Sequence, residues 1–274
     1  MRKLQEIFSG RHPVVMGILN VTPDSFSDGG KYASIDSALK KAGEMVDSGA
    51  EIIDIGAEST RPGAELVSEA EELARLIPAV EAVRAKFPDV ALSADTYKPA
   101  VAAAAVGAGA DIINDVVSDI SGGYKMAKVA AKLNCGLVIT HNNRGAEIKA
   151  DFFEKFLDNM RKKLDAALAA GVEAKNIILD PGIGFGKTFS QNVELIARLK
   201  GLKKFGFPVL LGVSRKSMFS QIVGDDFSDR DDATAAVGAI AALNNFADIL
   251  RVHDVKKTLN AVKTALTIKK IWTK

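Results

Sequence analysis

Eight short apolar segments recur along the chain, and a stretch of helical periodicity separates each from the next. The apolar segments are 13–20, 51–57, 90–95, 111–117, 136–141, 177–181, 208–214 and 247–253. Continuous apolar runs between turn residues are typical of strands that are buried on both faces. In the first helical stretch, 34–48, one face carries Ile35, Ala38, Leu39, Ala42 and Val46. The other helical stretches are 65–86, 98–107, 123–133, 152–170, 191–203, 231–245 and 256–269.

Strict alternation of strand and helix implies parallel strands that are joined by right-handed crossovers. Eight repeats favour a closed (β/α)8 TIM barrel, and an open doubly wound sheet is the alternative architecture. A chain of 274 residues suits the barrel, since such barrels occupy roughly 250 residues as one domain. No linker, low-complexity segment or block of like charges divides the sequence, so we expect a single domain over residues 1–274.

Composition excludes several kinds of protein. The 36 basic and 34 acidic residues leave a net charge of +2, which gives no broad electrostatic footprint for a nucleic acid. The single cysteine, Cys135, excludes an intramolecular disulfide. The N-terminal segment lacks the apolar stretch of a secretion signal, and no uncharged run reaches the ~18 residues of a membrane span. We therefore expect a cytoplasmic protein that binds neither nucleic acid nor membrane.

Polar residues gather where the predicted strands end. They are Asn20, Asp54, Glu58, Asp95, Asn114, Asp115, His141, Asp180, Ser214, Arg215, Lys216, Arg251, His253 and Asp254. In a (β/α)8 barrel these ends form one ring, and barrel active sites lie there. One such residue could be a strand cap or half of a salt bridge. The whole set is hard to explain in that way, because the opposite strand ends show no comparable residues, and it predicts an active site.

Two connections at this predicted rim are unusually long. Residues 21–30 and 58–64 are rich in proline, glycine and small polar side chains, and long loops at this face usually serve function. A third segment, 180–188, is rich in glycine but matches neither a P-loop nor the G-x-G-x-x-G pattern, because Pro181 and Lys187 stand where glycines are required. This segment predicts a tight turn before a helix, with Asp180 directed inward.

Seven runs that span nearly the whole chain carry a family resemblance. They are MGILNVTPDSFSDGG (16–30), IIDIGAESTRPGA (52–64), ADTYKP (94–99), INDV (113–116), ILDPGIGFGKT (178–188), LLGVSRKSMF (210–219) and RVHDV (251–255). In this order they resemble the dihydropteroate synthases. The resemblance implies a pterin-binding barrel and a transferase of folate biosynthesis, in a class of sulfonamide targets. The enzyme would join 4-aminobenzoate to 7,8-dihydropterin-6-ylmethyl diphosphate and give 7,8-dihydropteroate and pyrophosphate.

The pterin ring edge presents two adjacent N–H donors and a carbonyl acceptor. A carboxylate matches the donor pair and an ammonium suits the acceptor, so the resemblance implies Asp180 at the donors and Lys216 at the carbonyl. Arg251 would stack on the ring face, where a planar guanidinium fits. The resemblance also implies that Asp95 and Asn114 bond the remaining ring nitrogens and that Val116 and Phe185 wall the slot.

The diphosphate requires positive charge and hydrogen-bond donors. The resemblance assigns it Asn20, Thr60, Arg61, Arg251 and His253, and places Asn20 and Asp28 at a Mg²⁺ ion on the phosphates. The second substrate would lie between the long loops. There Phe26 and Pro62 would sandwich the benzoate ring, and Ser217, near the start of the seventh helix, would receive its carboxylate.

The reaction implied by the family is a dissociative substitution. The C–O bond ionises, the dihydropterin delocalises the cation, and the aryl amine attacks. Catalysis of this kind depends on electrostatic stabilisation and on the exclusion of water, and it needs no strong base. The catalytic roles therefore fall to Asp180, Lys216, Arg251 and His253.

The sequence departs from the family pattern after the fifth predicted strand. It reads His141-Asn142-Asn143-Arg144-Gly145, where family members commonly have His-Met or His-Asn-Arg. Because this is one asparagine more, we leave Asn142 and Asn143 out of the expected site.

Two other functions remain as alternatives. A pterin-binding methyltransferase of the methyltetrahydrofolate–corrinoid type would share Asp95, Asn114 and Asp180 but has no use for a diphosphate clamp. A non-catalytic pterin-binding relative would be expected to lack Lys216, Arg251 or the first loop. Family analogy also suggests a homodimer that forms through the C-terminal helices.

Overall fold

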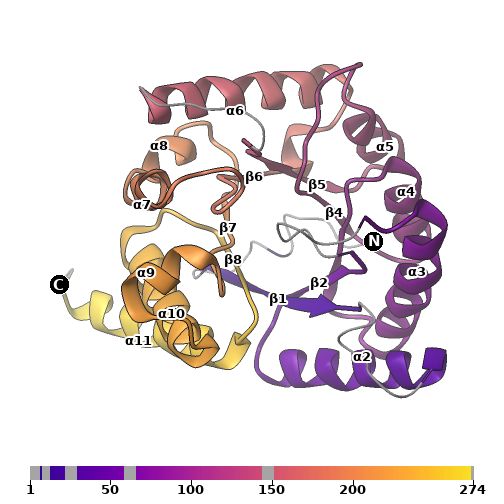
Figure 1. Cartoon of the computed structure of the whole chain (residues 1–274), viewed down its shortest axis with the longest axis horizontal. Coiled ribbons are helices and arrows are strands. Elements are labelled where there is room, and N and C mark those ends of the chain that lie inside the picture. The colour runs from indigo at the N-terminus through magenta and orange to yellow at the C-terminus, as the bar shows by residue number, and fades with distance from the viewer. Residues whose placement is uncertain (1–6, 8–12, 22–29, 59–65, 144–150, 273–274) are drawn as a thin grey trace.

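The computed structural model describes residue 7 and residues 13–21, 30–58, 66–143 and 151–272 of the chain. Its strands are β1 (Val14–Asn20), β2 (Ile52–Gly56), β3 (Ala91–Asp95), β4 (Ile112–Asp115), β5 (Gly136–Thr140), β6 (Ile177–Asp180), β7 (Leu210–Leu211) and β8 (Ile249–Val252). They pair in parallel in the order β6-β5-β4-β3-β2-β1-β8-β7, and a bridge between Leu179 and Val209 joins β6 to the start of β7. The predicted (β/α)8 barrel is confirmed, and the doubly wound alternative is wrong (Figure 1).

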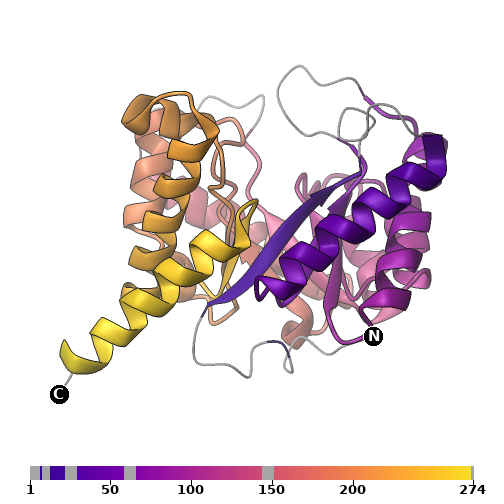
Figure 2. The same cartoon turned by 90° about the horizontal axis from the view of Figure 1, so that it is seen from below.

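Helices surround the barrel. They are α2 (Gly30–Asp47), α3 (Glu69–Lys86), α4 (Pro99–Gly107), α5 (Lys125–Leu133), α6 (Phe152–Ala169), α7 (Phe189–Ala197), α8 (Lys200–Lys203), α9 (Ser220–Val223), α10 (Phe227–Asn244) and α11 (Val255–Trp272), with 3-10 turns η2 (Ala174–Asn176) and η3 (Ser217–Phe219). Figure 2 shows α2 and α11 lying along β1, and both contact it. None of the helices in the described ranges is long and apolar enough to cross a membrane.

Three predicted elements differ from those in the structure. The stretch 191–203 forms two helices, α7 and α8, and the strand expected at 208–214 is reduced to the two residues of β7. The helix expected at 231–245 starts at Phe227, because the Asp226 carboxylate caps it by accepting from Ser228 N at 2.7 Å. The loop before this helix is therefore shorter than predicted.

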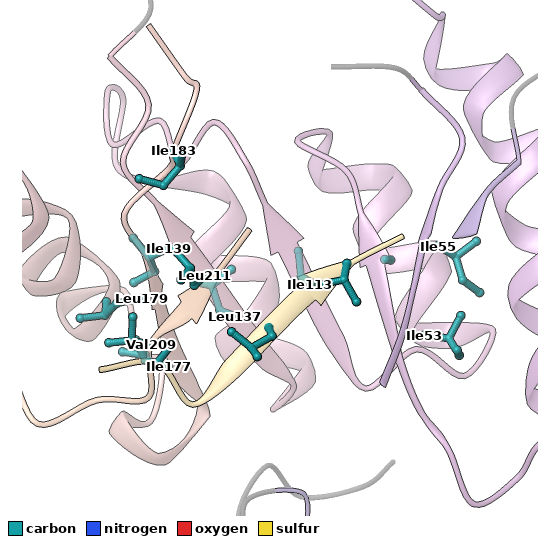
Figure 3. Close-up of a cluster of buried hydrophobic side chains, with 14 of the residues drawn as sticks. Ile53, Ile55, Ile113, Leu137, Ile139, Ile177, Leu179, Ile183, Val209 and Leu211 are labelled. Atoms are coloured by element: carbon teal, nitrogen blue, oxygen red, sulfur yellow. The ribbon is translucent and has the colours of Figure 1, made fainter. Parts of the chain in front are cut away.

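The strands are apolar on both faces. Outward side chains such as Ile53, Ile113, Leu137 and Leu179 pack in the main core, which includes residues of the surrounding helices (Figure 3). A second cluster combines Ile7 of the N-terminal segment with residues from the other face of the strands, which are Val14, Met16, Ile52, Ala91, Ile112, Val138, Ile178, Leu210 and Ile249. These residues form the apolar floor of the barrel interior.

The next inward position, two residues further along each strand, is often polar. Because side chains alternate across a strand, Ile52 is followed by Asp54, Ile112 by Asn114, and Ile178 by Asp180. By the same rule, Ser93, Thr140 and Arg251 belong to this layer, which lies directly above the apolar floor on the C-terminal side. The alternation therefore brings polar side chains from strands far apart in the sequence into one layer.

The N-terminal strand ends are more polar than the sequence analysis allows. Asp111, immediately before β4, pairs with Arg84 Nη2 at 2.5 Å and accepts from Leu92 N at 2.9 Å. Asp248, immediately before β8, accepts from Lys203 Nζ at 2.6 Å and from Val209 N at 2.7 Å. The expectation that this end shows no comparable polar set is wrong, because carboxylates here tie helices and strands together.

Candidate active site

Arg251 links three strands of the barrel. From β8, its Nε donates to Asp54 Oδ2 on β2 and its Nη2 to Asp95 Oδ2 on β3, both at 2.6 Å. The same Asp54 oxygen accepts from Asn114 Nδ2 on β4 at 3.0 Å. A guanidinium with two carboxylate partners is held in a fixed orientation. The structure thus brings Asp95, Asn114 and Arg251 together, as the sequence predicts.

Asp54 is a residue of this cluster to which the sequence analysis gives no ligand role. Its carboxylate is completely buried and bonds two of the residues expected to hold the pterin. The signal in the sequence was its inward position two residues after Ile52. Its partners could not be inferred, because Arg251 lies 197 positions away along the chain.

Several buried oxygens of this layer have no hydrogen-bond partner among the described residues. They include Oδ1 of Asp54, Asp95 and Asn114, and the hydroxyls of Ser93 and Thr140. A buried acceptor without a donor costs roughly 1–3 kcal/mol, and such groups in native structures are explained by bound water, ions or a functional role. The inner layer therefore offers acceptors to N–H donors of a ligand or of water.

The charges in this cluster interact strongly. Burial raises the pKa of Asp95 to about 7, although the nearby Arg251 guanidinium opposes the shift. Arg251 itself has a pKa above its usual value because Asp54 and Asp95 outweigh the effect of burial. Arg251 therefore remains a cation, whereas Asp95 changes its protonation near neutral pH.

Asp180 lies at the end of β6, where a glycine turn begins. Its Oδ1 accepts from Gly182 N at 2.7 Å. Gly182 has a φ of +65°, and a Cβ there would lie 2.0 Å from the His141 carbonyl oxygen, so only glycine fits. Burial raises the pKa of Asp180, and the Lys216 ammonium is the largest opposing influence. The turn thus holds one carboxylate oxygen and leaves the other for a ligand.

Lys216 reaches the same turn from the segment after β7. Its Nζ donates to the Ile183 carbonyl and lies 4.9 Å from the centre of the Phe185 ring. A Cβ on Gly184 would lie 3.2 Å from Lys216 Cδ, so the glycine lets the lysine stem pass close to the turn. Lys216, Asp180 and Phe185 are therefore neighbours, as the sequence predicts.

The two asparagines after β5 bond the Val116 segment and this turn. Val116 is buried, and its carbonyl accepts from Asn142 Nδ2 at 3.0 Å. Asn143 N donates to Phe185 O at 3.2 Å and its Nδ2 to Gly186 O at 3.3 Å. The asparagine pair left out of the expected site therefore connects the Val116 and Phe185 segments.

The remaining described residues of the expected site lie nearer the rim. Asn20 is exposed at the end of β1. His253 Nδ1 lies 2.9 Å from Ser214 Oγ, and His253 N donates to the same oxygen at 3.1 Å. Ser217 is exposed but begins the 3-10 turn η3, not the main helix α10, so the expected place near the start of the seventh helix needs correction. The residues expected in the two long loops, Phe26, Asp28, Thr60, Arg61 and Pro62, lie outside the described residues.

The described residues contain no group of three or more His, Cys, Asp or Glu side chains that could hold a metal ion. Asn20 is the one expected metal-linked residue within the described ranges, and it provides an exposed amide oxygen. Mg²⁺ commonly binds through one or two protein ligands, several waters and substrate phosphates. The exposed amide fits an ion of that kind and not a closed protein cage.

Together these groups suit a flat and polar heterocycle. Carboxylates, an amide, an ammonium and a guanidinium converge at the C-terminal end of the barrel, where barrel enzymes bind their substrates. An aromatic side chain, Phe185, lies beside the ammonium. The molecule is thus a (β/α)8-barrel enzyme with a polar site that suits a ring with donors and acceptors on its edge.

Comparison with known proteins agrees with this class. The model of the family described as pterin binding enzyme matches residues 16–253. The chain is 46% identical to the dihydropteroate synthase of Clostridium beijerinckii, over 94% of this chain and 95% of that protein. It is 48% identical to that of Bacillus subtilis, over 91% and 86% of the two chains.

Solved structures give the same result. A dihydropteroate synthase from Clostridium difficile in the presence of pteroic acid has a TM-score of 0.88 at 42% identity and covers 94% of this chain and 97% of its own. The Xanthomonas albilineans enzyme with 4-aminobenzoic acid has a TM-score of 0.88 at 39% identity, over 94% and 93%. The chain belongs to the pterin-binding enzyme family, among the dihydropteroate synthases. It is a transferase of folate biosynthesis.

Proposed function

We propose that this chain joins 4-aminobenzoate to 7,8-dihydropterin-6-ylmethyl diphosphate, with release of pyrophosphate. The observation that carries the proposal is the convergence of Asp95, Asn114, Asp180, Lys216 and Arg251 on one polar layer. Support also comes from two relatives, one solved with pteroic acid and the other with 4-aminobenzoic acid. Pteroic acid contains both a pterin and a 4-aminobenzoate moiety.

The pterin would be held by its edge. Asp180 has one oxygen on Gly182 N, and its carboxylate would take the adjacent N–H pair of the ring. Asp95 Oδ1 and Asn114 Oδ1, which have no partner among the described residues, would accept from further ring nitrogens. Lys216 would donate to the ring carbonyl and exchange its bond with Ile183 O. Each step gives a buried polar atom a partner or replaces one partner by another.

The ring faces would be covered by three side chains. Phe185 lies beside the Lys216 ammonium, and the buried Val116 segment is tied to Asn142. The Arg251 guanidinium would stack on the ring while it keeps its bonds to Asp54 and Asp95. A rigid slot of this kind holds the methylene carbon of the substrate in a fixed place for attack.

The diphosphate would leave toward the rim. Arg251 on β8 and His253, directly after β8, would face the diphosphate. The other residues that bind it would be Asn20, Thr60 and Arg61. Asn20 and Asp28 would hold Mg²⁺ together with the phosphates, and the ion would supply charge neutralisation of the leaving group. The chain's own cation, Arg251, is permanently charged and would stabilise the developing charge.

The reaction would follow a dissociative course. The bond between the methylene carbon and the diphosphate oxygen breaks, and the electron pair leaves with pyrophosphate. The amine of 4-aminobenzoate then forms the new C–N bond and loses its proton to solvent. The aryl amine is neutral at pH 7, so no side chain must act as a strong base. The role of the site is to orient the pterin and to stabilise pyrophosphate.

The second substrate would bind above the pterin. Phe26 and Pro62 would enclose the benzoate ring, and the exposed Ser217 would receive its carboxylate. A sulfonamide, whose aryl amine and acidic group have the same arrangement, would compete for this pocket.

A coupled assay tests the function. Pyrophosphate release is measured with each substrate alone and with both, and the organic product is identified by mass spectrometry. We expect release that requires both substrates, and a product with the mass of dihydropteroate. Release without 4-aminobenzoate, or no release from folded enzyme that binds both substrates, would contradict the proposal. The methyltransferase alternative predicts no pyrophosphate at all.

We also propose a cytoplasmic homodimer. The support is that α10 and α11 pack against each other and leave Ile240, Ile268 and Ile271 exposed. Apolar side chains exposed on adjacent helices are typical of an interface. Sedimentation of the wild-type chain and of an Ile240→Glu variant checks this, since the variant should shift toward monomer; two identical sedimentation profiles would exclude this surface.

A further inference from the structure

We propose that Lys187 is a positioning residue for the pterin slot. Its ammonium holds the glycine turn 182–186 against the end of β5 and thereby fixes both Asp180 and Phe185. The inference rests on the proposed function and deepens it, because it names a residue outside the expected set of ligands.

The first support is the set of bonds that Lys187 makes. Its Nζ donates to Gly182 O at 2.6 Å, to His141 O at 2.8 Å and to Phe185 O at 3.2 Å. An ammonium has three protons and accepts nothing. All three protons therefore have backbone partners, so Lys187 acts on the turn and not directly on a substrate.

The second support is what these carbonyls belong to. Gly182 also donates its N–H to Asp180 Oδ1 at 2.7 Å, and its Cα packs against the His141 carbonyl, where a Cβ would lie at 2.0 Å. Lys187 bonds the carbonyls on both sides of this close contact. A shift of the turn would therefore move the carboxylate that binds the pterin edge.

The third support is that two other residues, Asn143 and Asn192, also bond the same turn. Asn143 donates its N–H to Phe185 O at 3.2 Å and its amide to Gly186 O at 3.3 Å. Asn192 Oδ1 accepts from Gly184 N at 2.7 Å. Side chains on both sides of the turn therefore bond its backbone. Lys187 makes two such bonds, to Gly182 O and Phe185 O, whereas the side chains of Asn143 and Asn192 make one each.

The protonated form of Lys187 is destabilised by its surroundings. Burial and the nearby Lys216 lower the pKa of Lys187 to about 7, with a smaller effect from Lys163, whereas Asp180 opposes the shift. A solvent-exposed lysine would avoid this cost. Lys187 makes its three carbonyl bonds in spite of this cost, which agrees with a structural role for the lysine at this position.

The experiment compares Lys187→Met with a matched control. Lys203→Met removes another partly buried ammonium, which bonds Asp248 at the N-terminal end of the strands. For wild type and both variants, KM for each substrate, kcat, the affinity for pteroic acid by calorimetry and Tm are measured. We expect K187M to raise the KM for the pterin diphosphate at least about tenfold and to weaken pteroic acid similarly, because small displacements of positioning groups have effects of this size.

The KM for 4-aminobenzoate at saturating pterin should change less than about twofold in K187M. Lys187→Arg, which keeps a cationic donor, should recover part of the pterin affinity. K203M should lower Tm and leave both KM values near those of wild type. A pterin KM for K187M within about threefold of wild type, or equal rises in both KM values, would overturn the inference.

A second variant tests the inference if K187M does not fold. Asn143→Ala removes the amide bond to Gly186 O and keeps the backbone bond to Phe185 O. It should raise the pterin KM by about threefold or more with the 4-aminobenzoate KM unchanged; an unchanged pterin KM would count against a positioning role of this turn. If the wild-type chain binds pteroic acid but releases no pyrophosphate, the proposed function fails, and the calorimetric comparison still tests Lys187.

Discussion

The two ends of the barrel carry similar polar residues in different states of pairing. At the N-terminal end, Asp111 pairs with Arg84 and Asp248 with Lys203, and each carboxylate also accepts a strand N–H. Neither has a buried oxygen without a partner. At the C-terminal end, Asp54 and Asp95 share Arg251 and each keeps one buried oxygen without a partner among the described residues.

The difference indicates that the same residue types serve stability at one end of the barrel and ligand binding at the other. Paired carboxylates at the N-terminal end hold helices onto strands and contribute stability. Unsatisfied acceptors at the C-terminal end lower stability, by roughly 1–3 kcal/mol each, and a sequence keeps such groups where a ligand satisfies them. Changes at the two ends should therefore affect different quantities: ligand affinity at one end and folding at the other.

The largest expected effect is that of Asp180→Asn on pterin binding. The amide places a donor against a ring donor, which costs roughly 2–4 kcal/mol, or about 30- to 800-fold in affinity. The Tm should stay near that of wild type. Calorimetry with pteroic acid measures the affinity, and a value within about threefold of wild type would remove Asp180 from the site.

At the opposite end, Asp111→Asn should affect folding and spare the kinetics. It removes the charged partner of the partly buried Arg84, which keeps its bonds to backbone carbonyls such as Gly109 O. We therefore expect a loss of about 1–3 kcal/mol, smaller than for a fully buried pair. Thermal unfolding should show a Tm lowered by several degrees, with about 2–4 °C for each kcal/mol in a chain of this size. A raised KM with an unchanged Tm would break the comparison between the ends.

Lys216→Ala should lower kcat more than about tenfold, a loss of about 1.4 kcal/mol of transition-state stabilisation, with little change in Tm. A lysine that only formed surface salt bridges would contribute under about 1 kcal/mol to stability and little to turnover. Steady-state assays on enzyme with a verified Tm distinguish a role in turnover from a role in surface salt bridges. Near-normal turnover would assign Lys216 to the surface and not to the site.

The smallest effect is a change in the pH dependence of stability in Asp95→Asn. Burial raises the pKa of the Asp95 carboxyl from 3.8 in the unfolded chain to about 7 in the folded one, so the folded state binds more protons between these values. Its contribution to stability is present below pH ~4 and is lost as pH rises through ~7. The Tm of wild type minus that of the variant should fall as the pH rises from ~4 to ~7. Parallel profiles would show that burial of Asp95 has no such effect.

Most strands and the inward polar layer could be predicted because both follow from local patterns. The apolar runs predicted the strands, and the polar residues at their ends predicted a single polar ring. In the fold, the alternation of side chains across each strand places Asn114 and Asp180 above Ile112 and Ile178. The strand β7 is shorter than predicted, since it pairs with β8 at Leu210 and Leu211 and reaches β6 through one bridge at Val209. An apolar run in the sequence does not show how many of its residues will pair with neighbouring strands.

The roles of Asp54, Asp111 and Lys187 depend on contacts that no local pattern contains. Asp54 bonds Arg251 across 197 positions, and Lys187 bonds His141 across 46. The Asp111–Arg84 pair at the N-terminal end was missed for the same reason, since its helix and strand meet only in the fold. Sequence patterns identified which polar side chains lie at the strand ends but not which of them bond each other.

The most direct test of the contrast between the two ends is a crystal structure of the chain with pteroic acid. We expect the pterin at the C-terminal end of the strands, with its adjacent N–H pair on the Asp180 carboxylate and its ring nitrogens on Asp95 Oδ1 and Asn114 Oδ1. The pairs at Asp111 and Asp248 should be unchanged. A pterin that binds elsewhere, or that leaves these acceptors without a ligand contact, would contradict the assignment of the polar layer to substrate binding.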